Sequence, residues 1–154
     1  MKMRIDWYKV SPSAYNAMLN LQRTVNKSKL DKYLLELIKI RASQLNGCAH
    51  CLDMHTKDAL AIGESEQRIN LLTVWREAPI YTPREKAAIA WCESLTLISQ
   101  IGAPDNLYEE VVSFFNPEEL VELTLAIVAI NAWNRLGVGF KSDVGNYVSN
   151  RNSK

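Results

Sequence analysis

The stretch Gly47-Cys48-Ala49-His50-Cys51-Leu52-Asp53-Met54-His55 constrains the fold and the chemistry of this chain more than any other. It holds two cysteines at a C-x-x-C spacing and a histidine four residues after the second cysteine. On a helix of about 3.6 residues per turn that begins near Cys48, positions 48, 51 and 55 share one face. We therefore expect two thiols in the first turn of a helix, with an imidazole one turn later.

This placement of the thiols favours redox chemistry. A helix N-terminus presents free N–H groups and the positive end of the helix dipole, which stabilise a thiolate, and a nearby imidazole can accept or return the proton. Such a pair is suited to disulfide exchange. Helix-dipole reasoning alone identifies Cys48 as the more acidic and more exposed thiol.

A helical hairpin is expected around the motif. Residues 31–45 have the apolar pattern of an amphipathic helix that ends at Asn46-Gly47, and a second helix runs from Cys48 to Gly63. Glu36 lies 11 residues before Gly47 and His55 lies 8 after it. At a rise of about 1.5 Å per residue, the two antiparallel positions differ in level by less than one turn. Glu36 can then reach His55, directly or through a water, in a relay with Cys51. The alternative is a solvated glutamate.

The rest of the chain also has helical patterns, so we predict an all-α fold of helical hairpins packed as a bundle. Ser11 or Ser13 caps the first helix, with Pro12 near its start, and Thr82-Pro83-Arg84-Glu85 is a capping box. Besides the two helices of the hairpin, the expected helices span residues 11–25, 64–77, 82–99, 105–115 and 116–136.

The composition, 47% hydrophobic and 23% charged over 154 residues, fits a single domain over residues 1–154 with a redox core at about 31–63. A net charge of +1 gives no reason to expect nucleic acid or an anionic membrane as a partner. Because there is no run of 18 apolar residues and residues 1–11 lack a signal-peptide pattern, we expect a cytoplasmic protein. In that compartment a C-x-x-C pair favours redox or metal chemistry over a permanent bridge.

The spacing of Glu36, Cys48, His50, Cys51 and His55 is similar to the E-x11-C-x-H-C-x3-H signature of the alkylhydroperoxidase D (AhpD) core, in the carboxymuconolactone decarboxylase superfamily. The resemblance covers nearly the whole chain and implies an AhpD-like helical bundle. It extends to residues 41–47, Gly63, residues 75–79 and residues 131–136.

The resemblance implies a role for each motif residue. Cys51 would be oxidised by a hydroperoxide to a sulfenic acid, and Cys48 would act as proton donor and resolving thiol, which gives a Cys48–Cys51 disulfide. Glu36, His50 and His55 would form the proton relay. A thiolate attacks the O–O bond, the sulfenic acid condenses with the partner thiol, and an external dithiol restores the pair. The attacking cysteine thus differs from the one that the helix dipole favours.

The resemblance also implies partners. A hydroperoxide would be the substrate, and a lipoyl-bearing or thioredoxin-like protein would be the dithiol reductant, with no cofactor. The predicted last helix is apolar around much of its circumference from Leu120 to Trp133, which indicates burial on several sides. Homo-oligomerisation would supply that burial, and the resemblance points the same way, to a homo-oligomer with a hexamer favoured over a trimer or dimer.

His50 fits the motif less simply than the other residues, because it lies about 200° around the helix from Cys48. It would act through the first turn of the helix, contact a neighbouring subunit, or be a surface histidine. A zinc site could use Cys48, Cys51, His55 and His50, but closed zinc sites usually take ligands from two separated segments. We therefore expect no bound metal.

Other readings of the cysteines are weaker. A c-type haem site needs histidine directly after the second cysteine, where Leu52 stands, and a thioredoxin-like fold would surround the motif with strands. Cys92 is expected to be a core thiol.

Four aromatic residues either line a pocket for an organic hydroperoxide or belong to the core or an interface: Trp75, Trp91, Trp133 and Tyr81.

The function that we predict is a thiol-dependent peroxidase of the alkyl hydroperoxide reductase type, acting in antioxidant defence through Cys48 and Cys51. One alternative is a non-catalytic dithiol redox sensor or interaction protein. Another is a lyase like carboxymuconolactone decarboxylase, which is weakened because that chemistry does not depend on a C-x-x-C pair.

Overall fold

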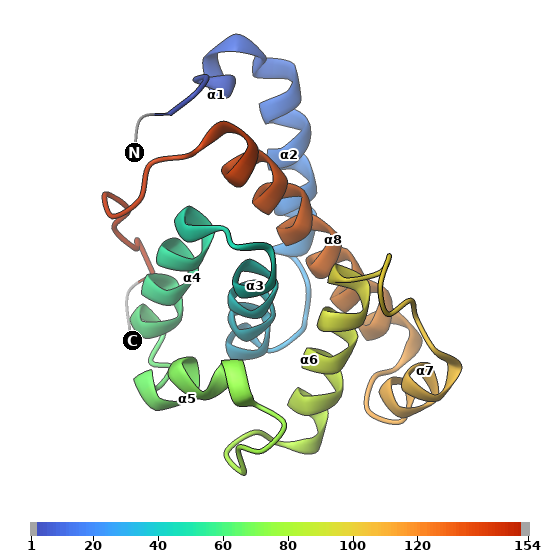
Figure 1. Cartoon of the computed structure of the whole chain (residues 1–154). Helices are drawn as coiled ribbons and strands as arrows, with labels where there is room; N and C mark the ends of the chain where they lie inside the picture. The colour runs from blue at the N-terminus through green and yellow to red at the C-terminus, as the bar shows by residue number, and fades with distance from the viewer. Residues whose placement is uncertain (1–2, 152–154) are drawn as a thin grey trace.

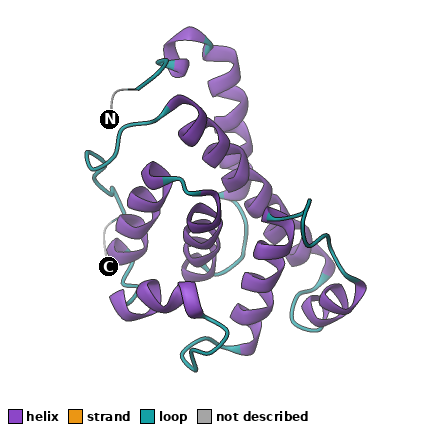
Figure 2. Ribbon diagram, viewed as in Figure 1, coloured by secondary structure: helices purple, strands orange, loops and turns teal. Residues whose placement is uncertain are grey.

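The computed structural model describes residues 3–151 and is built from helices and loops (Figures 1 and 2). The predicted all-α bundle of helical hairpins is confirmed, since residues 3–151 contain no strand. In chain order the elements are α1 (Trp7–Val10), α2 (Pro12–Val25), α3 (Lys32–Asn46), α4 (Ala49–Ala61), α5 (Glu66–Leu71), the 3-10 helix η1 (Leu72–Val74), α6 (Pro83–Thr96), α7 (Asp105–Val112) and α8 (Pro117–Phe140).

Helix α3 is the centre of the bundle and packs against α4, α6 and α8 (Figure 1). Leu37, Ile38 and Ile40 have no exposed surface, so α3 is buried on several faces. The Asp31 side chain accepts a hydrogen bond from Leu34 N–H and caps the helix. At the other end Gly47 takes the left-handed conformation (φ 64°), which turns the chain directly into α4. The predicted hairpin is therefore present.

Helix α8 crosses the bundle and packs on α2, α3, α4 and α6. Asn116 and Glu119 form a capping box at its start, and the helix continues to Phe140, four residues beyond the expected end. Its length and mean hydropathy of 1.3 would permit a membrane span, but 39% of that window is buried inside the protein. The buried residues of α8, among them Leu123, Ile127 and Ile130, belong to the hydrophobic core.

Three local predictions were wrong or incomplete. The short helix α1 was not predicted, and Ser11 precedes α2 without a side-chain capping bond, because its hydroxyl lies 3.4 Å from that of Ser13 instead. The helix expected over residues 64–77 is α5 followed by η1, and it begins only after Ser65 caps it. The capping box of Thr82 and Glu85 is confirmed.

A buried amide network joins the end of α3 to α8. Asn46 Nδ2 donates to Asn131 Oδ1 (3.0 Å) and to Asn134 Oδ1 (2.9 Å). Asn134, which has no exposed surface, donates in turn to Ser43 Oγ at 3.0 Å. Buried polar groups with their partners satisfied favour one arrangement of the helices. This network sets the position of the α3–α4 turn relative to α8.

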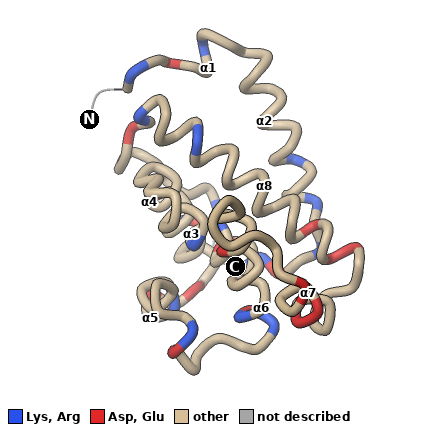
Figure 3. The backbone as a smooth tube through the Cα atoms, turned by 45° about the vertical axis from the view of Figure 1, so that its right-hand side comes forward, with Lys and Arg blue, Asp and Glu red and all other residues tan. Residues whose placement is uncertain are grey.

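Charged residues of both signs are spread along the chain, and acidic residues gather on α7 and at the start of α8 (Figure 3). Asp105 lies in the first turn of α7, and Glu118 and Glu119 lie in the first turn of α8. Negative charge at these positions stabilises a helix through its dipole.

Candidate active site

The two motif cysteines lie at the turn between α3 and α4. Cys48 is the N-cap of α4, and its Sγ accepts a hydrogen bond from Cys51 N–H at 3.3 Å. The structure joins the two in a disulfide, with their Cα atoms 5.4 Å apart. Both residues are 2% exposed. The pair is thus oxidised and largely covered, at the N-terminus of a helix as the spacing predicts.

Helix α8 covers this disulfide with a glycine. A Cβ built on Gly137 would lie 2.8 Å from Cys48 Sγ and 3.3 Å from Cys51 Sγ, so only glycine fits at this position without a shift. Gly137 had a detectable signal in the sequence, because a glycine inside a helical pattern often marks close packing. The close approach of α8 is therefore part of the site.

Glu36 and His55 meet across the hairpin. Glu36 Oε2 lies 2.9 Å from His55 Nδ1, and both side chains are buried. Because a carboxylate can only accept, Nδ1–H of His55 is the donor and Nε2 is left free to accept. The direct contact that the residue count predicted is present.

The charge states of the pair follow from their surroundings. Burial alone would raise the pKa of Glu36, but the His55 hydrogen bond and the Lys39 charge outweigh it and lower this pKa from 4.5 to about 2. Burial lowers the pKa of His55, although the hydrogen bond to Glu36 opposes that effect. Near neutral pH the pair is therefore a carboxylate and a neutral imidazole.

Two cationic side chains that sequence reasoning missed also reach Glu36. Lys39 Nζ lies 2.8 Å from Glu36 Oε1, and Arg151 Nη1 lies 2.6 Å from the same oxygen. Lys39 could have been found, because it is three residues after Glu36 on one helix. Arg151 is 115 residues away and carries no local signal.

His50 is turned toward the chain that follows α8. Its Nδ1–H donates to the carbonyl of Asp143 at 2.5 Å, while the residue lines one cavity together with Cys51 and another together with Cys48. The structure therefore places His50 beside the sulfurs but does not bring it to Glu36 or His55 through any described hydrogen bond within residues 3–151.

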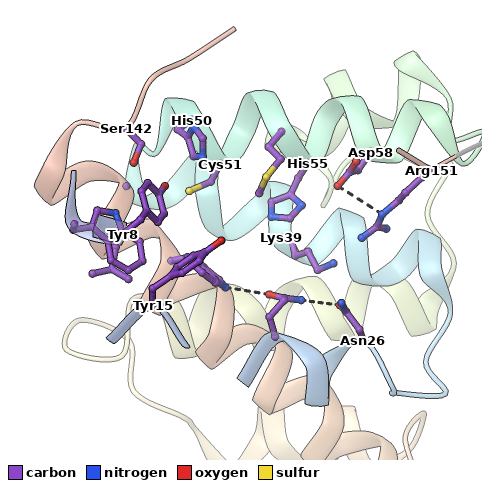
Figure 4. Close-up of a pocket in the computed structure, with 16 residues that line it drawn as sticks. Tyr8, Tyr15, Asn26, Lys39, His50, Cys51, His55, Asp58, Ser142 and Arg151 are labelled. Atoms are coloured by element: carbon purple, nitrogen blue, oxygen red, sulfur yellow. Dashed lines mark hydrogen bonds and ion pairs between the residues drawn. The ribbon is translucent and has the colours of Figure 1, made fainter. Parts of the chain in front are cut away.

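A cavity of about 300 Å³ opens beside Cys51 and His55 (Figure 4). Lys39, Asp58 and Arg151 border one end. The other end is aromatic and is lined by Trp7, Tyr8, Tyr15 and Trp133, whose rings contact one another. The cavity thus brings one motif sulfur, the imidazole and an apolar wall together.

The profile of the carboxymuconolactone decarboxylase family matches residues 12–94, more than half of the chain. The chain belongs to this family. The protein YdfG of Bacillus subtilis, whose function is uncharacterized, is 43% identical over 138 residues that cover 90% of this chain and 94% of YdfG.

Solved structures place this family member with AhpD-like proteins. A protein of unknown function from Agrobacterium tumefaciens, described as a candidate antioxidant defence protein AhpD, is 46% identical, with a TM-score of 0.91 over 95% of this chain and all of that one. The debrominase Bmp8 is 16% identical, with a TM-score of 0.78 over 90% of this chain and 74% of Bmp8, and so shares the fold alone.

Of the four aromatic residues singled out in the sequence of this AhpD-like protein, one lines the cavity. Trp133 does so, whereas Trp75, Trp91 and Tyr81 are buried elsewhere, and the two indoles donate to Glu93 and Thr124. The contributions of α1 and α2 were missed because they depend on how the chain ends pack.

Cys92 is the core thiol that we expected, and burial raises its pKa to about 12.

The residues of the site do not fit a resident metal ion. The zinc ligand set needs thiolates, and Cys48 and Cys51 are joined to each other. Glu36, His55 and Asp58 bring ligand atoms within 4.8 Å of one another. However, Lys39 and Arg151 already neutralise the two carboxylates of that group.

Proposed function

We propose that this AhpD-like protein is a thiol-dependent peroxidase that reduces organic hydroperoxides in antioxidant defence. The observation that carries the proposal is the shared cavity of Cys51 and His55, in which Glu36 holds His55 Nδ1 and leaves Nε2 free to accept a proton. The family and the C-x-x-C pair support an antioxidant role, and the cavity supports the choice of Cys51 as the sulfur that meets the peroxide.

The reaction starts from the reduced pair. His55 takes the proton of the Cys51 thiol, and the thiolate attacks one peroxide oxygen and breaks the O–O bond. The leaving alkoxide takes a proton from His55 and departs as the alcohol, while Cys51 becomes a sulfenic acid. The Cys48 thiol then attacks that sulfur, water leaves, and the disulfide forms. A dithiol reductant returns two electrons and two protons to the pair and is itself oxidised to a disulfide.

The cavity favours an organic peroxide over hydrogen peroxide as substrate. Its aromatic end, formed by Trp7, Tyr8, Tyr15 and Trp133, presents a ring surface that hydrogen peroxide has no apolar group to contact. An alkyl or aryl group bound against these rings would instead be removed from water, which stabilises binding. Binding there would place the hydroperoxide group beside Cys51.

The partners follow from this function. A lipoyl-bearing or thioredoxin-like protein of the cytoplasm would supply the dithiol. We further propose a homo-oligomer, with a hexamer favoured, in which the exposed side chains of α8 are covered: Val121 is 67% exposed and Val128 is 50% exposed, one heptad apart on the same face. Size-exclusion chromatography with light scattering tests the assembly, and a monomer at micromolar concentration would contradict it.

The central experiment measures consumption of tert-butyl hydroperoxide by the reduced protein with a dithiol reductant, together with a count of free thiols. We expect turnover, loss of two thiols per equivalent of peroxide, and no turnover in Cys51→Ser. The matched control is Cys92→Ser, which removes a buried thiol outside the site and should retain activity.

Two outcomes would contradict the peroxidase. Loss of thiols without turnover would favour the redox sensor. A Cys51→Ser variant that still reduces peroxide at the normal rate, or a Cys48→Ser variant in which no sulfenic acid can be trapped at Cys51, would contradict the assigned roles of the two sulfurs.

A further inference from the structure

After α8 the chain turns back and runs along α4; we call residues 141–151 the returning segment (Figure 1). Lys141 ends α8 in the left-handed conformation (φ 55°), and Ser142 N–H donates to the Gly137 carbonyl at 3.0 Å. The segment then follows α4 from its first turn to its last. Residues about 90 positions apart in the sequence therefore lie side by side.

The returning segment is held by polar side chains of α4. Three of these, His50, Asp53 and Lys57, are spaced i, i+3 and i+7, so they form one stripe of the helix. His50 Nδ1–H donates to the Asp143 carbonyl (2.5 Å), and Asp53 Oδ2 accepts from Gly145 N–H (3.2 Å). Lys57 Nζ donates to the carbonyls of Gly145 (3.1 Å) and Tyr147 (3.0 Å). Asp58 Oδ1 accepts from Tyr147 OH (2.8 Å) and from Ser149 Oγ (2.6 Å).

The described part of this segment ends at Arg151, which reaches inward. Its Nη1 lies 2.6 Å from Glu36 Oε1, and its Nε lies 3.7 Å from Asp58 Oδ2. The Arg151 side chain is 36% exposed, whereas Glu36 is fully buried. Figure 4 shows the guanidinium beside Asp58 at the polar end of the cavity that holds His55. A surface segment thus delivers a cation to two buried carboxylates.

The charges around His55 sum to zero only when Arg151 is counted. Glu36 and Asp58 are negative, and Lys39 and Arg151 are positive, so a neutral His55 completes a balanced group. Of the residues that line this cavity, those from α8 carry no charge, and the remaining titratable side chains are Tyr8, Tyr15 and His50. The Tyr147 phenol, on Asp58, stays neutral because burial raises its pKa to about 12.

We propose that Arg151 is a positioning residue of the redox site: the returning segment places its guanidinium on Glu36 and Asp58, and this keeps His55 neutral with Nε2 free for the Cys51 proton. Without that cation the group carries a net charge of −1. A proton on His55 restores neutrality, and an imidazolium cannot act as the base. This inference rests on the proposed peroxidase function for its consequence, but the charge balance itself can be measured without turnover.

The test is an NMR titration of the histidine side chains in the oxidised protein. The chain has two histidines, so the His55 signal is assigned by difference with a His50→Gln variant. In Arg151→Gln we expect the midpoint of the His55 titration to rise by about one pH unit, because a positive charge near the imidazole is lost. Arg151→Lys keeps the charge and should restore most of the difference. The control Arg23→Gln removes an exposed cation of α2 and should leave the midpoint unchanged.

Activity gives a second readout. The rate of peroxide consumption falls at low pH as His55 becomes protonated. In Arg151→Gln this fall should occur at a higher pH, by the same amount as the His55 midpoint shifts, with the rate at high pH retained. Lys57→Met, which loosens the returning segment but leaves Arg151 in the chain, should give a smaller shift in the same direction and serves if Arg151→Gln folds poorly.

An unchanged His55 midpoint in both Arg151→Gln and Lys57→Met would overturn the proposal, as would an Arg151→Lys variant that titrates like Arg151→Gln. These results are independent of whether the protein turns over peroxide. If His55 titrates as expected and no hydroperoxide is consumed, the charge balance stands and the peroxidase function fails.

Discussion

The α3–α4 hairpin and the returning segment are held in place by different forces. The hairpin is anchored by apolar burial, with Leu37, Ile38 and Ile40 fully covered. The returning segment is anchored mainly by hydrogen bonds and ion pairs, and its Val144 and Val148 are exposed. Segments with few buried apolar contacts open at a lower free energy than the core. The groups of the proposed chemistry are thus fixed by the core, and the cation that adjusts their charge is held more weakly.

The largest expected effect comes from breaking the hairpin's ion cluster with Glu36→Gln. The variant leaves Lys39 buried without its carboxylate, which is expected to cost about 3 to 5 kcal/mol of unfolding free energy. It also removes the group that orients His55, so peroxide turnover should fall about 100-fold or more. Urea unfolding and peroxide consumption at pH 7 measure the two effects.

The same variant has a defined pH signature. The pKa of Glu36 is lower in the folded protein than its ordinary value of 4.5, so its contribution is present above pH 4.5 and is lost as the pH falls toward about 2. The difference in unfolding free energy between the protein and Glu36→Gln should therefore shrink as the pH falls from 5 to 3. A difference independent of pH over this range would mean that Glu36 is not held as a carboxylate by the fold.

Sequence reasoning located the hairpin because its information is local. The Asn46-Gly47 stop, the C-x-x-C spacing and the helical rise together predicted that Glu36 and His55 would meet, and they do. The second predicted helix and the Thr82–Glu85 capping box depend on residues within one or two turns of each other. Such patterns are read directly from the chain.

The sequence did not locate the contacts that depend on how distant segments pack. Arg151 is 115 residues from Glu36, and Gly137 is 86 residues from Cys51. For neither residue does the local sequence pattern indicate which distant residue it contacts. Of the aromatic wall, Trp133 alone was singled out from the sequence, because Trp7 and Tyr15 reach Trp133 through the packing of α1 and α2 on α8.

A second substitution tests the junction between the hairpin and α8, where the returning segment departs. Gly137→Ala places a Cβ 2.8 Å from Cys48 Sγ, and the required shift should lower the unfolding free energy of the oxidised protein by about 1 to 3 kcal/mol. Gly139→Ala is the matched control, since no heavy atom lies within 4 Å of its Cβ. That control should gain up to about 1 kcal/mol from helix propensity.

The two alanine variants are expected to change the unfolding free energy in opposite directions, so they are easily distinguished. Thermal or urea unfolding of the oxidised proteins would measure it. If Gly137→Ala were as stable as Gly139→Ala, α8 would not press on the disulfide, and the returning segment would start from a less constrained position.

The smallest expected effect compares a tyrosine hydroxyl in each region. Tyr147 OH donates to Asp58 Oδ1 at 2.8 Å in the returning segment, and Tyr33 OH donates to the Ile62 carbonyl at 2.9 Å at the base of the hairpin. Replacing either tyrosine by phenylalanine removes one hydrogen bond, worth about 1 kcal/mol. We expect Tyr33→Phe to lower the free energy of global unfolding by that amount, because the hairpin unfolds with the core.

For Tyr147→Phe we expect global unfolding to stay within about 0.5 kcal/mol of the original protein, because Ser149 and Arg151 still hold Asp58. Local opening should become easier instead, so amide exchange of residues 143–151 should accelerate about fivefold, which corresponds to 1 kcal/mol. If Tyr147→Phe lowered global stability as much as Tyr33→Phe and left that exchange unchanged, the returning segment would unfold together with the core. The weaker anchoring inferred for Arg151 would then be wrong.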